Sequence, residues 1–120
     1  MKNKLKVIIE NKYEKRLEEL GRPRKKGQSI LQESKECFIT GRTDYLHKHH
    51  IYGGSNRIIS EEEGFFIYLI PEFHTIGPEA VHNDDEFLKK LQEICQRIYE
   101  ENHTRDEFIR LIGQNYITEK

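Results

Sequence analysis

The sequence predicts a small α+β protein with a basic N-terminal helix, a central pair of short strands and two C-terminal helices. Apolar residues recur at three- and four-residue steps near both ends of the chain, whereas the middle is punctuated by glycine and rich in histidine. At 120 residues the chain is long enough for one modest hydrophobic core. The composition, 35% hydrophobic and 34% charged, indicates helices whose outer faces carry much solvated charge.

The helix expected at the N-terminus covers residues 3–20 and ends at Gly21 and Pro23. Its apolar positions follow the helical period and are Leu5, Ile8, Ile9, Tyr13, Leu17 and Leu20. Residues 28–36 are polar, and we expect them to form a second short helix that runs into Cys37.

Two further helices are expected in the C-terminal third. The first covers about residues 84–102, where Asn83 and Glu86 resemble an N-terminal capping arrangement. Thr104 and Glu107 form a capping-box pattern that opens the last helix, which ends at the next glycine. Both helices are expected to serve the core rather than an active surface.

The middle of the chain predicts a two-stranded unit followed by a short helical turn. Residues 45–52 are expected to form the first strand, residues 53–56 a turn, and residues 65–70 a second strand that stops at Pro71.

Charge divides the chain into a basic N-terminal extension, residues 1–36, and an acidic remainder, residues 37–120, which we expect to fold together as one compact domain. Residues 1–36 contain 11 Lys and Arg against 6 Asp and Glu, a charge of +5, and residues 37–120 contain 9 against 15, a charge of −6. A basic end on an acidic body can bring a polyanion to one face.

Several classes of protein are excluded by composition. No apolar run approaches the roughly 18 residues that a spanning helix needs, so no membrane partner is expected. The start of the chain lacks the apolar segment of a secretory signal, and the expected location is the cytoplasm. The two cysteines, Cys37 and Cys95, are expected to be reduced, and Cys95 to be a small buried apolar residue.

A basic loop is expected directly after the first helix. Glycines bracket it and a proline lies inside it, so it can follow a phosphate backbone. The candidate nucleic-acid-binding residues in this loop are Arg22, Arg24, Lys25 and Lys26.

Histidine is concentrated in one short stretch of the sequence. Five of the six histidines lie between residues 47 and 82, namely His47, His49, His50, His74 and His82. Imidazole binds borderline divalent metals and can also act as a general base near neutral pH. In a strand, His47 and His49 share a face while His50 points to the other. We therefore expect one histidine to bind a metal and its neighbour to take a proton from water.

Five segments and a C-terminal Gly-x-Asn-Tyr together resemble one family. They are Cys37-Phe-Ile-Thr-Gly41, Leu46-His-Lys-His-His-Ile51, Gly53-Gly-Ser-Asn-Arg57, Tyr68-Leu-Ile-Pro-Glu-Phe-His74, Val81-His82-Asn83 and Gly113-Gln-Asn-Tyr116. In this order they resemble the HNH endonucleases, above all the small bacteriophage and prophage HNH proteins. The resemblance covers about residues 37–117.

The resemblance implies a ββα-metal fold and a divalent-metal-dependent endonuclease that hydrolyses DNA phosphodiester bonds. By position, His49, His74 and His82 correspond to metal ligands and His50 to the general base. Arg57 is a candidate to neutralise charge on the scissile phosphate. Histidine ligands suit Zn, Ni or Mn, whereas Mg prefers oxygen ligands.

The sequence departs from the family at two places. The asparagine that gives the motif its middle letter is replaced by Phe65, and Asn56 is the candidate to substitute for it. Many relatives bind a structural zinc with two Cys-x-x-Cys pairs, but here three of those four thiols are absent, so local packing must replace that zinc.

These departures leave a second hypothesis open. The chain could retain the HNH fold without its chemistry and act as a nucleic-acid-binding or protein-binding module, such as a phage inhibitor of a host defence system. The acidic residues 37–120 would then offer a surface to a protein partner. A zinc-dependent transcription factor ranks last because the chain lacks a long basic recognition helix. The substrate form, the metal used and the oligomeric state are not determined by the sequence.

Overall fold

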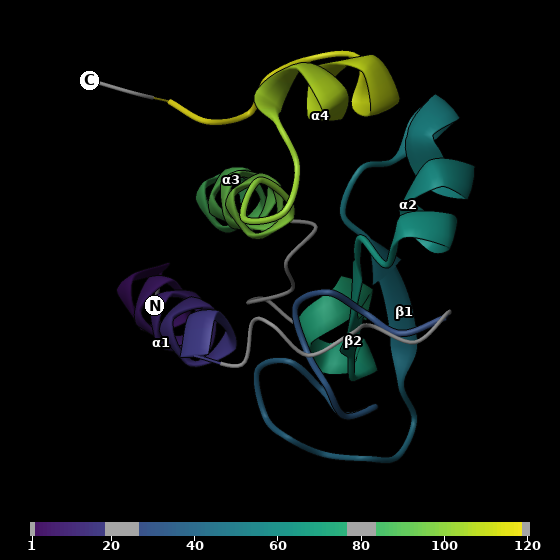
Figure 1. Ribbon diagram of the computed structural model, residues 1–120. Helices are drawn as coiled ribbons and strands as arrows, with labels where there is room; N and C mark the ends of the chain where they lie inside the picture. The colour runs from purple at the N-terminus through teal and green to yellow at the C-terminus, as the bar shows by residue number, and fades with distance from the viewer. Residues whose placement is uncertain (1, 19–26, 77–83, 119–120) are drawn as a thin grey trace.

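The structure, a computed structural model, describes residues 2–18, 27–76 and 84–118 (Figure 1). Its helices and its two-stranded antiparallel sheet confirm the α+β class. The elements are α1 (Lys2–Glu18), β1 (His47–His50), α2 (Arg57–Glu63), β2 (Phe66–Leu69), α3 (Asp85–Tyr99) and α4 (Arg105–Ile112).

The two strands pair as expected but are shorter than the sequence predicts. His47 lies opposite Leu69, and His50 lies opposite Phe66. On the other edge of β2, an isolated parallel bridge joins Cys37 to Tyr68. After β2 the chain makes one π-helical turn, Glu72–Ile76, which is the short helical turn expected from the sequence.

The connection between the strands contains a helix that the sequence did not predict. A 3-10 turn at Gly54–Asn56 leads into α2, which ends at Gly64 with a φ of 79°, a conformation that glycine adopts without strain. The side chain of Ser60 fixes α2 against the end of β1: its hydroxyl donates to the Tyr52 carbonyl at 2.8 Å and accepts from the Tyr52 N–H at 3.3 Å.

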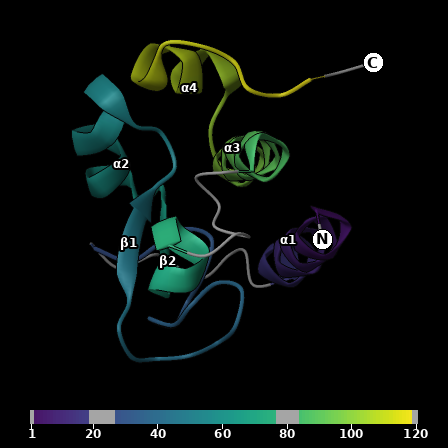
Figure 2. The ribbon, with the colours of Figure 1, turned by 180° about the vertical axis from the view of Figure 1, so that it is seen from behind.

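Helix α3 lies between α1 and α4 in both ribbon views (Figures 1 and 2). One hydrophobic cluster includes Ile9 of α1, Leu91 and Ile94 of α3 and Phe108 of α4, and all four side chains are at most 1% exposed. The basic N-terminal helix therefore contributes to the same core as the strands and the C-terminal helices.

The helix starts in the C-terminal third are set by side-chain caps. Asp84 caps α3 by accepting from the Phe87 N–H, one residue after the expected Asn83, which lies outside the described residues. Thr104 and Glu107 form the capping box of α4 as predicted. Phe87 and Cys95 are buried, and the predicted apolar stripe of α3 faces the core.

The prediction of a helix over residues 28–36 is wrong. This segment lies along β2 in an irregular conformation, because its polar side chains bond the strand rather than solvent. The Ser29 hydroxyl donates to the Phe66 carbonyl, and the Gln32 side-chain oxygen accepts from the Tyr68 N–H at 2.8 Å.

The two cysteines agree with the expectation of reduced thiols. Cys37 and Cys95 are both buried and neither forms a disulfide. Burial raises the pKa of Cys37, but hydrogen bonds from Thr40 and from the N–H groups of Ile70 and Ile39 outweigh it, and the net effect lowers that pKa. In the described part of the chain, no helix is long and apolar enough to cross a membrane.

Candidate active site

Strand β1 distributes its four side chains between two faces. His47 and His49 point to one side and Lys48 and His50 to the other, as the alternation of a strand requires. His49 is buried with 6% of its side chain exposed, and His47 is exposed. This separation confirms the expectation that the adjacent pair His49 and His50 would not converge.

The face of His47 and His49 meets His74, which the π-helical turn after β2 holds in place. The His74 N–H donates to the Ile70 carbonyl at 3.1 Å, so the turn closes directly on the end of the strand. The His74 ring centroid lies 5.3 Å from that of His47 and 5.5 Å from that of His49. Three imidazoles, two from β1 and one from the turn after β2, thus lie close together.

Within this cluster the Nδ1 atoms of His47 and His74 lie at the hydrogen-bonding distance of 3.1 Å. Two nitrogens that bind one tetrahedral ion at about 2.0–2.1 Å lie about 3.3 Å apart, so the observed separation fits two ligands of one metal. The donors are all imidazoles, and this set suits Zn, Ni or Mn better than Mg.

The third predicted ligand, His82, lies outside the described residues. Among the residues that are described, no group of three or more His, Cys, Asp or Glu side chains is arranged to hold a metal ion. Of the predicted ligands, the structure places His49 and His74 next to each other, and His47 is a further neighbour of His74.

On the opposite face of β1, His50 contacts an acidic residue of α2. The His50 Nε2 lies 2.8 Å from Oε1 of Glu61, and the ammonium of Lys48 donates to Oε2 of the same carboxylate at 2.9 Å. These hydrogen bonds from His50 and Lys48 lower the pKa of Glu61 below its ordinary value. The carboxylate is therefore ionised near neutral pH and can only accept hydrogen bonds.

Lys48 is held by aromatic rings as well as by Glu61. Its ammonium lies 4.2 Å from the ring centroid of Phe66 and 5.8 Å from that of Tyr68, both on β2. Cation–π contacts of this kind favour one position of the ammonium over many. Lys48 in turn fixes one oxygen of Glu61 and leaves the other to His50.

The structure gives the two other candidates on this side different positions. Arg57 is the exposed first residue of α2 and lies one helical turn before Glu61, on the same face of the helix. The side-chain amide of Asn56 donates to the Ile112 carbonyl at the end of α4 at 2.8 Å. Asn56 thus ties α4 to the start of α2, and its amide N–H is used for structure.

Position 65, where the resemblance to HNH endonucleases predicts an asparagine, is part of the core. Phe65 is fully buried, and its ring centroid lies 5.5 Å from that of Tyr52 and 5.7 Å from that of Tyr99. The predicted DNA contacts Arg22, Arg24, Lys25 and Lys26 lie outside the described residues.

Two residues of this site were not predicted. His47 carried a usable signal, because it shares a strand face with His49. Glu61 carried none, because it is 11 positions after His50 and becomes its neighbour only through the helix between the strands.

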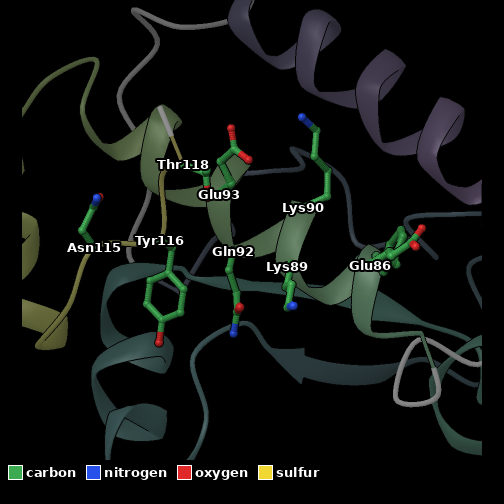
Figure 3. Close-up of a pocket in the computed structure, with 9 residues that line it drawn as sticks. Glu86, Lys89, Lys90, Gln92, Glu93, Asn115, Tyr116 and Thr118 are labelled. Carbon is green, nitrogen blue, oxygen red and sulfur yellow. The ribbon is translucent and has the colours of Figure 1, made fainter. Parts of the chain in front are cut away.

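A separate cavity of about 700 Å³ lies between α3 and the C-terminal segment (Figure 3). Lys89, Gln92 and Tyr116 are among the residues that line it. Of the site histidines that the structure describes, His47, His49, His50 and His74, none borders this cavity. Its charged lining contains both signs, with Lys89 and Lys90 beside Glu86 and Glu93, and it shows no preference for an anionic ligand.

Comparisons with family models, curated proteins and solved structures found no match to this chain.

Proposed function

We propose that this protein is a divalent-metal-dependent HNH-type endonuclease that hydrolyses DNA phosphodiester bonds. The observation that supports this best is the division of β1, which puts His49 beside His74 on one face and His50 beside Glu61 on the other. Hydrolysis of a phosphodiester needs a cation at the phosphate and a base at the water, and the strand offers a candidate for each.

His49, His74 and His82 would hold the metal, with His47 as a further ligand or as a hydrogen-bond partner of His74. A bound divalent cation would polarise the scissile phosphate and stabilise the departing 3′ oxygen. The imidazole-rich donor set and the 3.1 Å separation of two ring nitrogens support this assignment.

His50 would take a proton from the attacking water. The water oxygen forms the new bond to phosphorus, the bond from phosphorus to the 3′ oxygen breaks, and the departing oxygen takes a proton from solvent. Arg57 lies on the face of α2 that carries Glu61 and would place its guanidinium fork against a phosphate oxygen.

DNA would be bound mainly through its backbone by the basic residues 22–26. We expect neutralisation of Arg22, Arg24, Lys25 and Lys26 together to weaken DNA binding and to reduce its dependence on salt. An unchanged salt slope would remove this loop from the proposed interface.

The test is nicking of supercoiled plasmid with Mg, Mn, Ni or Zn added singly, beside a chelator control. The proposal requires cleavage that depends on metal and falls by about 10²–10⁴ in His50→Ala, the contribution of a general base. His103→Ala is the matched control, because His103 is an exposed histidine that stacks on Tyr99 at the far end of α3. Calorimetry of metal binding should give similar affinities for wild type and His50→Ala.

A catalytically silent binding module is the alternative, and two observations favour it. The motif asparagine is replaced by the buried Phe65, and the amide N–H of Asn56 is used to hold α4. If folded, metal-loaded protein cleaves no DNA with any of the four metals, this alternative replaces the nuclease. Its partner would then be sought through the acidic residues 37–120.

A further inference from the structure

We propose that Glu61 is a positioning residue for His50: its carboxylate accepts the hydrogen of Nε2 and thereby leaves Nδ1 as the nitrogen that receives the proton of water. This inference rests on the proposed nuclease function for its catalytic meaning. Its effect on the imidazole itself does not depend on cleavage and can be measured separately.

The first step is the identity of the donor. An ionised carboxylate has no hydrogen to give, so at the 2.8 Å separation the Nε2 of His50 must carry the hydrogen. In the neutral ring the other nitrogen then has the free lone pair. Glu61 therefore selects one of the two neutral forms of His50.

The second step is that Glu61 is itself held in place. Lys48 donates to its other oxygen at 2.9 Å, and the ammonium of Lys48 lies against the ring of Phe66. The hydroxyl of Ser60, the residue before Glu61, is bonded to the backbone of Tyr52, two residues after His50. The contact between Glu61 and His50 is thus supported on both sides by residues close to His50 in the chain, Lys48 and Tyr52.

The third step concerns the ring. The side chain of His50 is 19% exposed, and its ring lies edge-on to Phe66 with the centroids 6.5 Å apart. An aromatic neighbour limits where the ring can turn but gives no preference between its two nitrogens. The carboxylate supplies that preference, as an orienting group does for a histidine base.

The variants that test this are Glu61→Gln, which keeps the shape of the side chain but can also donate, and Glu61→Ala, which removes the contact. Glu62→Gln is the matched control, since it removes the adjacent exposed carboxylate of the same helix. The melting temperature of each variant checks that the fold is retained.

The first measurement is the nitrogen NMR spectrum of the histidine rings in metal-free protein, at a pH at which free imidazole is neutral. We expect His50 to be in the Nε2–H form in wild type and Glu62→Gln, and to become a mixture of both forms in Glu61→Gln and Glu61→Ala. An unchanged His50 spectrum in both Glu61 variants would overturn the proposal, whether or not the protein cleaves DNA.

The second measurement is steady-state cleavage. Glu61→Gln should lower kcat by about tenfold to a hundredfold with little change in KM, a part of the about 10²–10⁴ that a general base contributes. In a His50→Ala background, adding Glu61→Gln should cause no further loss, because the residue acts through His50. A further loss of the same size in that background would contradict the positioning role. Absence of wild-type cleavage would reject the nuclease and leave the ring spectrum to decide the role of Glu61.

Discussion

Replacement of Ser60 by alanine tests how α2 is attached to the strand that carries the candidate site. Ser60 is fully buried, and its hydroxyl serves both the N–H and the carbonyl of Tyr52. Each buried backbone group that loses its partner costs about 1–3 kcal/mol. Within that range we take about 1 kcal/mol for the long 3.3 Å bond and about 1–2 kcal/mol for the 2.8 Å bond, so we expect Ser60→Ala to lower the free energy of unfolding by about 2–3 kcal/mol.

That loss corresponds to a large change in thermal midpoint. For 120 residues at about 2.1 cal/mol/K per residue, the entropy of unfolding is about 0.25 kcal/mol/K, and the midpoint should fall by about 8–12 °C. Thermal unfolding followed by circular dichroism measures it, with Ser55→Ala as an exposed control. A midpoint within about 2 °C of wild type would show that the Tyr52 backbone does not depend on this hydroxyl.

Three further changes give separate checks on the conformation at Tyr45, on α4 and on the proposed metal ligands. Tyr45 has a φ of 54°, a conformation that costs about 1–2 kcal/mol for any residue with a Cβ, so Tyr45→Gly should not lower stability to urea, whereas Tyr45→Val should, because β-branched residues tolerate this conformation worst. The hydrogen bond from the Thr104 backbone N–H lowers the pKa of Glu107. The stability that the ionised Glu107 carboxylate contributes is therefore present above its ordinary pKa of 4.5 and is lost as pH falls through the lowered pKa. Glu107→Gln should accordingly lose less stability than wild type on acidification, measured by urea unfolding at several pH values. Removal of a residue that only hydrogen-bonds a metal ligand typically weakens metal binding about 10–100-fold. His74→Ala, which removes a proposed ligand, should weaken zinc binding by more than this, measured by calorimetry. The loss in His47→Ala, compared with the same range, tells whether His47 is a ligand or a hydrogen-bond partner of a ligand.

The fold was predictable where apolar residues recur with the period of a helix or a strand. It was not predictable where contacts with other elements set the conformation of a segment. Both C-terminal helices and the hairpin follow from apolar spacing, and the predicted capping box of α4 is present, whereas α3 is capped by Asp84. Helix α2 has only 7 residues, too few to show a period, and it depends on the buried Ser60 contact. Residues 28–36 resemble a helix in composition, yet their hydroxyl and amide groups find partners on β2.

The site was predictable to the extent that it depends on strand alternation. His47 and His49 on one face and His50 on the other follow from a period of two, whereas the pairing of His49 with His74 was implied by the family resemblance. Contacts made through α2 could not be anticipated, since no sequence spacing places Glu61 beside His50. Asn56 was a candidate because asparagine is the residue type of the motif, but its side-chain amide donates to the Ile112 carbonyl and holds α4.

The replacement of the motif asparagine and the contact of Glu61 are linked through the core. Phe65 packs among Tyr52, Tyr99 and Phe108, so a polar side chain at this position would lie in an apolar cluster and lose that packing. A group that orients His50 must therefore come from another position. Glu61 lies in the last turn of α2, which turns its carboxylate toward β1, while Gly64 ends the helix and turns the chain into β2. The same short helix thus allows an aromatic core at position 65 and a carboxylate at His50, and in the proposed nuclease this carboxylate would orient the base without an asparagine at position 65.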